Sequence, residues 1–218
     1  MIDVQQVALQ GLPAVFYDLV ISGELANLAG MKAPANARRI WLLCLLAFCS
    51  IAAQAQHYVP TDAGSKVQFT IINHLIFTST VNGYFKGLKG SIRFDPRDLK
   101  SSSIDATVAV NTISTGIGKR DRDLLEEKYF NAAKYPVMRI VSTGIAATDK
   151  PSTYQLTAAL TIKGITRTIT FPFTAVVSAE AVQLTGKFTI NRKDFQVGPD
   201  NAIDDKLTVT LNVQAKKQ

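Results

Sequence analysis

Cysteine is scarce in this chain of 218 residues, and both copies, Cys44 and Cys49, lie in one short apolar run. No cysteine follows them. A disulfide framework, a cysteine nucleophile and a thiolate metal site are therefore excluded for the larger part of the sequence. Histidine is equally rare, since only His57 and His74 occur.

Patterns that mark common catalytic sites are missing too. The sequence has no Gly-x-Ser-x-Gly elbow, no His-Glu-x-x-His pair and no glycine-rich phosphate loop. One carboxylate pair, Asp204-Asp205, has no catalytic partner nearby in the sequence and is interpreted as part of a loop. We therefore expect that the protein is not an enzyme and that it holds no metal and no cofactor.

Charge is also sparse. Charged residues make up 19% of the chain against 47% hydrophobic residues, which favours a folded protein over a disordered one. The net charge of +7 is scattered along the sequence rather than gathered in stripes. We therefore expect no nucleic-acid binding, whereas weak attraction to an anionic membrane surface fits the charge. The oligomeric state is left open, a homodimer included.

The one long hydrophobic run, Ile40–Ala53, is too short to span a bilayer comfortably. Basic residues precede it, and the small-x-small pattern Ala53-Gln54-Ala55 follows it. This arrangement predicts a secretory signal peptide over residues 31–55, cleaved after Ala55. A buried hydrophobic helix is the alternative interpretation.

Met31 stands where the initiator of such a signal peptide would stand, so residues 1–30 are interpreted as a start-site artefact. Lipidation of a cysteine is a second alternative, but bulky Leu43 and Phe48 precede the two cysteines, where processing needs a small residue. The mature protein is therefore expected to cover residues 56–218 and to be periplasmic or secreted.

Alternation of apolar and polar residues dominates residues 56–218, which is typical of half-buried β-strands. Threonine and β-branched residues are frequent in these stretches, as a pleated surface prefers. The alternation predicts eight strands, over residues 67–71, 82–95, 104–110, 137–147, 155–162, 165–173, 182–190 and 207–214.

Turn signals separate the strands at short spacing, which favours antiparallel pairing of neighbours. These signals are Asn82-Gly83, Asp95-Pro96, Asp149-Lys150-Pro151, Lys163-Gly164 and Gly198-Pro199. Lys119–Asn131 breaks the alternation, because its apolar residues fall near helical spacing. We expect one short helix there, capping one end of the sheet.

Eight antiparallel strands with one apolar face each can hide that face in a sandwich or in a closed barrel. Closure at eight strands leaves an interior that holds side chains or one small ligand. A strand of about ten residues reaches roughly 33 Å, long enough for a thin molecule to lie end-on.

Five short motifs follow one another along residues 57–215. The first is Ser65–Ile71 followed by His74, and the second is Gly83–Phe85 followed by Gly90–Asp95. The third consists of Arg120-Asp121, Leu124, Tyr129-Phe130 and Tyr135-Pro136. The fourth is Leu160–Arg167, and the fifth is Asn191–Phe195. In this order and spacing they resemble the YceI-like family, also described as polyisoprenoid-binding or lipid-binding domains. The family often has histidine, glycine and tryptophan where this chain has Asp123, Gln196 and Tyr58.

The resemblance implies an all-β fold, a lipocalin-like eight-stranded antiparallel β-barrel with one short inserted helix. It implies export, and a hydrophobic channel that binds an isoprenoid, a quinone-like lipid or another long-chain amphiphile. Residues 56–218 are thus expected to form one YceI-like lipid-binding domain.

A long apolar tail needs a continuous apolar wall, because each methylene buried away from water contributes about 0.8 kcal/mol. By periodicity alone, a wall residue cannot be told from an ordinary core residue. The residues expected to form the wall are Phe69, Ile71, Phe85, Phe94, Val108, Phe130, Met138, Ile140, Leu160, Phe171, Phe173 and Phe188.

Two polar features have competing interpretations. His74 can bind a headgroup oxygen at the channel mouth, or it can be a satisfied histidine at the end of a strand. The charges of Arg120–Asp123 can form a polar gate, or solvated salt bridges on a short helix, and we favour the salt bridges.

Three functions compete at this stage. The favoured one is a lipid carrier or buffer outside the cytoplasm. A structural or stress-related interaction module, its barrel filled by its own side chains, is the first alternative. An enzyme that hydrolyses or isomerises the bound lipid is the second.

Overall fold

A computed structural model describes residues 56–74 and 77–218. The predicted signal peptide, Met31 and both cysteines lie outside these residues. In the described part of the chain, no helix is both long enough and apolar enough to cross a membrane.

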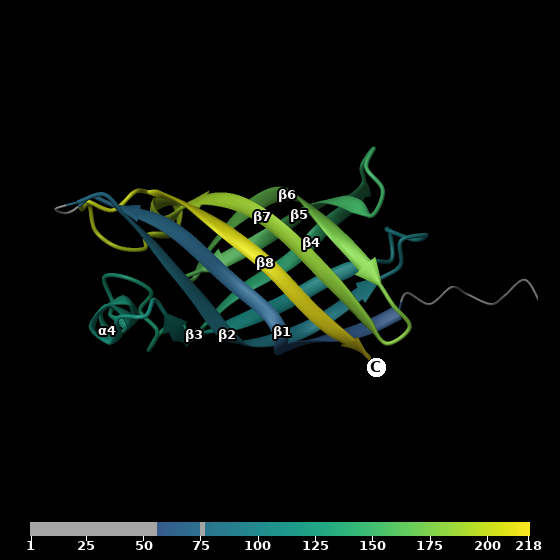
Figure 1. The fold of residues 1–218 in the computed structure, drawn as a ribbon, viewed down its shortest axis with the longest axis horizontal. Helices are drawn as coiled ribbons and strands as arrows, with labels where there is room; N and C mark the ends of the chain where they lie inside the picture. Colours follow the sequence, from purple (N-terminus) through teal and green to yellow (C-terminus); the bar gives the residue numbers. More distant parts are fainter. Residues whose placement is uncertain (1–55, 75–76) are drawn as a thin grey trace, which may run out of the picture. The chain divides into compact units, whose positions relative to one another are not determined.

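Eight strands form, one for each stretch of alternation. They are β1 (Gln56–Asn73), β2 (Ser79–Phe94), β3 (Ser103–Ser114), β4 (Val137–Ala147), β5 (Thr153–Ile162), β6 (Ile165–Val177), β7 (Ala181–Asn191) and β8 (Lys206–Lys217). Each pairs antiparallel with the next, and β8 pairs back on β1, so the sheet closes into a barrel (Figure 1). The predicted fold class is confirmed, and of the two ways to hide the apolar face the barrel is correct.

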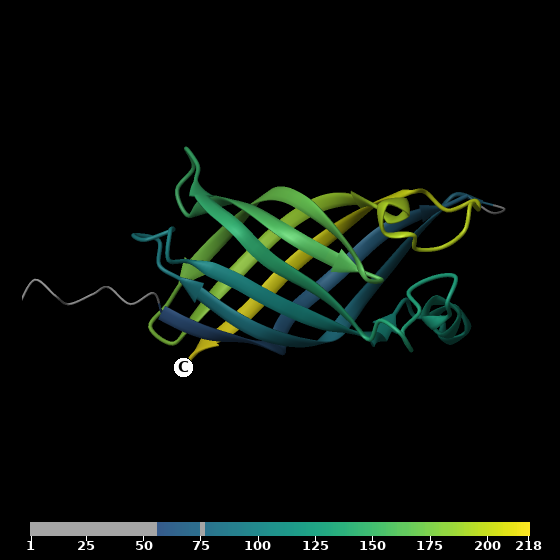
Figure 2. The same cartoon turned by 180° about the vertical axis from the view of Figure 1, so that it is seen from behind.

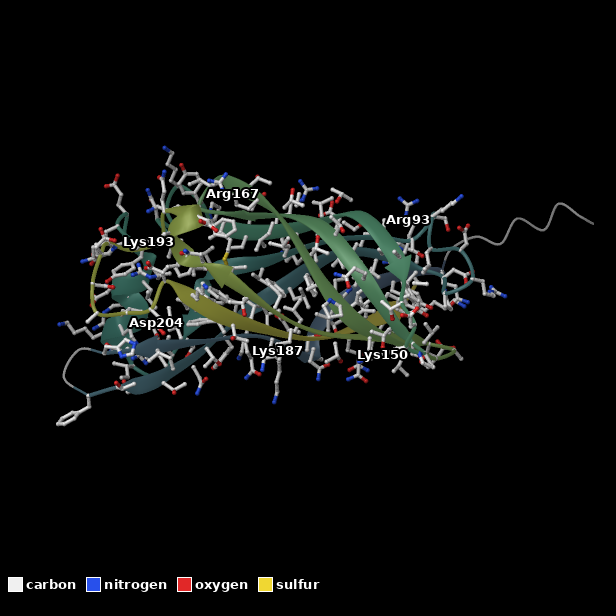
Figure 3. All side chains as sticks on the ribbon, turned by 90° about the horizontal axis from the view of Figure 1, so that it is seen from above. Arg93, Lys150, Arg167, Lys187, Lys193 and Asp204 are labelled. Atoms are coloured by element: carbon white, nitrogen blue, oxygen red, sulfur yellow. The ribbon has the colours of Figure 1, made fainter. Side chains whose placement is uncertain are left out.

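Alternation along the strands sets the two faces of the wall. In β3 the side chains of Ile104, Ala106 and Val108 are buried, and the residues between them are half-buried. Exposed Lys187, next to Phe188, and exposed Arg167 point outward from the barrel (Figure 3). Successive side chains of a strand point to opposite faces, so the apolar rows of all the strands meet inside the barrel.

The predicted turns at Asp95-Pro96, Asp149–Pro151 and Lys163-Gly164 are confirmed. At the third, Lys163 and Gly164 have φ of 50° and 74°, as a tight two-residue hairpin turn requires.

The turn predicted at Asn82-Gly83 is wrong. Both residues lie inside β2, opposite Thr70 and Phe69 of β1. Glycine occurs here because the Phe69 ring covers it, and a Cβ on Gly83 would come within 2.3 Å of the ring. The connection between β1 and β2 lies at residues 74–78 instead.

The inserted helix, α4 (Gly118–Leu125), is shorter than the predicted Lys119–Asn131. The chain leaves the helix at Glu126, whose backbone is extended, and continues in turns. A second short helix, η1 (Arg192–Phe195), was not predicted.

The two ends of the barrel differ, as Figure 2 shows. The "helix end" carries the connections 74–78, 115–136, 163–164 and 192–205, and therefore α4 and η1. The "opposite end" carries the short connections 95–102, 148–152 and 178–180. The inserted helix caps one end of the sheet, as predicted.

Candidate ligand-binding cavity

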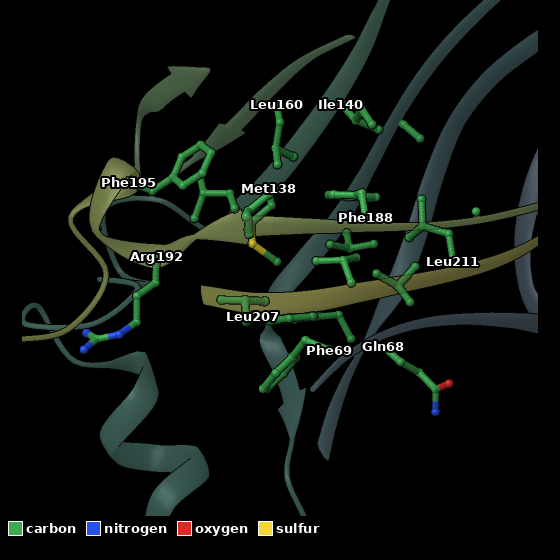
Figure 4. Close-up of a pocket in the computed structure, with 18 of the residues that line it drawn as sticks. Gln68, Phe69, Met138, Ile140, Leu160, Phe188, Arg192, Phe195, Leu207 and Leu211 are labelled. Atoms are coloured by element: carbon green, nitrogen blue, oxygen red, sulfur yellow. The ribbon is translucent and has the colours of Figure 1, made fainter. Parts of the chain in front are cut away.

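An apolar cavity of about 260 Å³ lies inside the barrel (Figure 4). All eight strands contribute side chains to its wall, together with α4, η1 and the segment that follows each of these helices. Most of the residues that line it are aliphatic or aromatic. Such a surface attracts apolar molecules and offers few hydrogen bonds.

Most of the predicted wall residues line this cavity. They are Phe69, Ile71, Phe85, Val108, Phe130, Met138, Ile140, Leu160, Phe171, Phe173 and Phe188. Phe94 and His74 do not line it.

Phe94 belongs to the packed side chains at the opposite end of the barrel and not to the cavity wall. Its ring packs edge-on against Tyr154 at 5.1 Å and against Phe173 at 6.1 Å between centroids. Phe94 is the last residue of β2, so it lies at the opposite end, where Tyr58 is also fully buried. The alternation placed Phe94 correctly on the inner face but could not give its height along the barrel.

Aromatic side chains organise the wall nearer the helix end. The Phe85 ring lies 5.7 Å from Phe69 and meets Phe130 edge-on at 5.8 Å. Across the barrel, Phe171 and Phe188 stack at 4.3 Å. Phe130 comes from the segment after α4, so this segment forms part of the wall as well as the cap.

The segment 192–205 supplies wall residues that the sequence analysis missed. Phe195, Val197 and Ile203 all line the cavity. The motif Asn191–Phe195 was recognised, but its place depends on how the loop folds back over the barrel. Nothing in the local pattern gives that path.

Arg192 fixes this loop. It is only 6% exposed, and Nε, Nη1 and Nη2 together make five hydrogen bonds of 3.0 to 3.1 Å, which is the full donor capacity of a guanidinium. The acceptors are the backbone oxygens of Asp204, Val197, Pro199 and Ile203 and the Oδ1 of Asn201. Figure 4 shows the guanidinium turned away from the apolar side chains, so the role of Arg192 is to hold the loop in place.

His74 ties the β1–β2 connection to the same loop. Its Nε2 lies 2.8 Å from Oδ1 of Asp204 and its Nδ1 lies 3.3 Å from Oγ1 of Thr78. Its backbone N–H donates to the oxygen of Ala202 at 2.7 Å. The structure therefore matches the satisfied histidine and gives no support to a headgroup contact at His74.

The charge cluster at the start of α4 holds the preceding loop. Arg120 donates from Nε and Nη2 to the Oγ1 and backbone oxygen of Thr115, at 2.8 and 2.9 Å. Oδ1 of Asp121 accepts the N–H of Thr115 at 2.8 Å and also its hydroxyl. Within the described ranges no ion pair joins the charges of 120–123 to one another, so the favoured salt-bridge interpretation is wrong.

Metal-binding groups do not gather at the cavity. Across residues 56–74 and 77–218, no three His, Cys, Asp or Glu side chains are placed to bind one ion.

A closed antiparallel barrel of eight strands around an apolar cavity defines the lipocalin-like class of small barrels. A family model, the YceI-like domain, matches residues 58–215. The chain belongs to this family, as its motifs indicated.

Relatives match over much of their length. A UPF0312 protein of Pseudomonas syringae pv. tomato is 29% identical over 178 residues, which cover 76% of this chain and 90% of that protein. Protein YceI of Salmonella newport is 28% identical over 130 residues, 59% of this chain and 66% of that protein.

Solved structures share the fold. BcnA of Burkholderia cenocepacia is 25% identical with a TM-score of 0.64, over 70% of this chain and 96% of that chain. A polyisoprenoid binding domain from Saccharophagus degradans has a TM-score of 0.61 at 16% identity, over 76% of this chain and 99% of that chain. At this identity the second likeness concerns the fold alone.

Proposed function

We propose that this protein binds an isoprenoid or another long-chain amphiphile inside its barrel and carries it outside the cytoplasm. The observation that supports this best is the apolar cavity of about 260 Å³. The polyisoprenoid binding domain from Saccharophagus degradans, which shares the barrel, adds support.

The cost of an empty interior favours a guest over a self-filled core. An unfilled cavity destabilises a protein by about 24 cal/mol per Å³. For the 260 Å³ observed here, the loss is about 6 kcal/mol. A module that used its barrel only as a scaffold would gain by filling this space, whereas a carrier needs it.

Binding without chemical conversion is part of the proposal. No carboxylate lines the cavity in the part of the chain that the structure describes. The carboxylates of Asp204 and Asp205 face His74 and Arg192 in the loop at the helix end. No acid–base pair of described residues is therefore placed against a bound lipid.

Export to the periplasm or the medium, through cleavage after Ala55, stays a prediction from the sequence, and so does the assignment of residues 1–30. Weak association with a membrane surface, a homodimer, and the absence of nucleic-acid binding and cofactors stay predictions as well.

The test is to purify the protein from cells that make it naturally and to identify bound molecules by native mass spectrometry and extraction. We expect one chain-like lipid per barrel. Delipidated protein should then bind a fluorescent long-chain fatty acid. Ala106→Phe, which projects a ring into the cavity, should weaken this binding, whereas Val176→Phe on the outer surface should not.

Two results would contradict the proposal. One is native protein without lipid that also fails to bind the probe after delipidation. The other is equal probe binding by Ala106→Phe and the unsubstituted protein, because the cavity would then not be the site.

A further inference from the structure

Three arginines line the cavity: Arg120, Arg139 and Arg192. They are the only charged residues among the described residues of the lining. A cation at the edge of an apolar cavity is costly unless its charge and its N–H groups have partners. The three differ in this respect.

Arg139 and Arg192 are fully engaged. Arg139 points to the outer face, where Nε and Nη2 donate to the two carboxylate oxygens of Asp105 at 2.8 and 2.5 Å. This guanidinium holds the pKa of Asp105 below its usual range. Arg192 uses all its donors on loop oxygens and also pairs with Asp205 at 3.1 Å.

Arg120 is the one cavity-lining cation in the described chain that has donors to spare. Only Nε and Nη2 have partners, both on Thr115, and no carboxylate of residues 56–74 or 77–218 lies within ion-pair distance of its guanidinium. The nearest charge in its network, Asp121, is directed at Thr115. No fully buried side-chain nitrogen of the described residues lacks a partner, so the part of the Arg120 guanidinium without a partner is not fully buried.

The position of Arg120 matches that of a headgroup ligand. It lies on α4 at the helix end, and Leu124, one helical turn further on, lines the cavity with it. This face of α4 thus presents a cation and an apolar side chain to the same space. Thr115 holds the guanidinium from one side, which fixes its orientation before any ligand arrives.

We propose that Arg120 binds an oxyanion headgroup, a carboxylate or a phosphate, of an amphiphile whose tail lies inside the barrel. This rests on the proposed function and adds the chemical class and the orientation of the ligand. A guanidinium suits this role because its planar donor pairs match the oxygens of both groups.

The experiment compares three probes that share a tail of sixteen carbons: palmitate, hexadecyl phosphate and hexadecan-1-ol. Their affinities for delipidated protein are measured by displacement of a fluorescent fatty acid. We expect the unsubstituted protein to prefer at least one anionic probe to the alcohol by about tenfold, as a charge-assisted hydrogen bond gives. The anionic probe preferred distinguishes carboxylate from phosphate.

Arg120→Gln should abolish this preference. The preference is a ratio of affinities measured within one variant, so a general change in the cavity that affects all three probes alike does not alter it. Arg122→Gln is the matched control, since it removes the same charge from an exposed position of α4 that does not line the cavity.

Equal preference in Arg120→Gln and the unsubstituted protein would overturn the inference while the proposed function stands. An equal loss of the preference in Arg122→Gln would also overturn it, because the general positive charge of α4, and not a contact with Arg120, would then explain the preference. If none of the three probes binds the unsubstituted protein, the proposed function fails, and this inference fails with it.

Discussion

Asp95 shows how a single buried carboxylate can hold a connection in place. It lies at the opposite end, and only 3% of it is exposed. Oδ1 accepts the backbone N–H of Arg97 at 2.9 Å and its Nε at 3.0 Å, and Oδ2 accepts Nη2 at 3.0 Å. These bonds hold the pKa of Asp95 below its usual range although burial opposes the shift, and the side-chain bonds from Arg97 contribute most.

The lowered pKa of Asp95 predicts acid sensitivity. The folded state binds this proton less tightly than the unfolded state does, so Asp95 stabilises the fold above its ordinary pKa of about 3.9. The stabilisation is lost as the pH falls from there through the lowered value. Urea unfolding of the unsubstituted protein and Asp95→Asn should show a stability gap that is widest near pH 6 and shrinks below about pH 4.

Asp149→Asn, at an exposed position in the connection 148–152, is the matched control and should follow the unsubstituted protein at every pH. A gap for Asp95→Asn that stays constant from pH 6 to pH 3 would mean that the Arg97 bonds do not persist in solution.

The sequence could not have given the partners of polar residues far apart in the chain. Asp204 and His74 are joined across the helix end only because the segment 192–205 folds back over the barrel. Arg192 was part of a recognised motif, but a guanidinium whose acceptors are backbone oxygens leaves no side-chain pattern to read.

Among the elements, β1 and β2 form a ladder of paired residues, called the seam below, that is interrupted in the middle. Their pairing breaks between Tyr58 and Val67 of β1, and the pairing of β1 with β8 shifts in the same stretch. Asp62 lies in this break, and its carboxylate accepts the N–H groups of Gly87 and Leu88 at 2.9 and 2.8 Å. A side chain thus replaces the strand partner that the break removes.

Asp62→Ala should weaken this seam. Leu88 is buried and lines the cavity, but Asp62 is exposed, so water can replace part of the lost hydrogen bonding to the N–H of Leu88. A fully buried donor left unsatisfied costs about 1–3 kcal/mol, so we expect a loss at the lower end, about 1 kcal/mol, in the free energy of unfolding, measured with urea. Asp62→Asn keeps one acceptor oxygen, so its free energy of unfolding should lie between those of Asp62→Ala and the unsubstituted protein.

Asp149→Ala serves as the control, and an exposed substitution of this kind changes stability by roughly 0.5 kcal/mol or less. If Asp62→Ala unfolds at the same urea concentration as Asp149→Ala, the carboxylate does not hold the seam.

At the scale of elements the sequence was most informative where the alternation was long. Strands such as β3 and β5 follow directly from their apolar rows, because alternate residues of each are buried. Gly83 misled the turn prediction, since glycine also serves where a neighbouring ring approaches the backbone. The end of α4 was misplaced because Phe130 keeps the apolar spacing without being helical.

For the whole molecule, the alternation allowed a barrel, but only the family resemblance implied an open channel inside it. Phe85 and Phe94 lie in the same strand and both are buried, yet only Phe85 borders the cavity. The difference depends on how completely the far side of the barrel fills the space, through Tyr154 and Phe173 in the case of Phe94. Such packing is a property of all the strands together.

The size of the cavity sets the last prediction, which concerns ligand length. A water-sized group takes about 15–30 Å³ depending on how the volume is measured, so 260 Å³ holds roughly 9–17 methylene-sized groups. Each added methylene should tighten binding by about 0.8 kcal/mol, roughly fourfold, until the cavity is full. Affinities of straight-chain carboxylates from C8 to C24 should therefore rise and then level off between about C9 and C17.

Leu156→Trp tests the origin of this limit, because Leu156 lines the cavity towards the opposite end and a larger side chain there shortens the space. The levelling-off should move to shorter chains in this variant and stay in place in Val176→Trp, whose position is 62% exposed on the outer surface. An affinity that keeps rising to C24, or a limit that both variants share, would mean that the tail is bound outside the barrel, since only an enclosed space imposes a length.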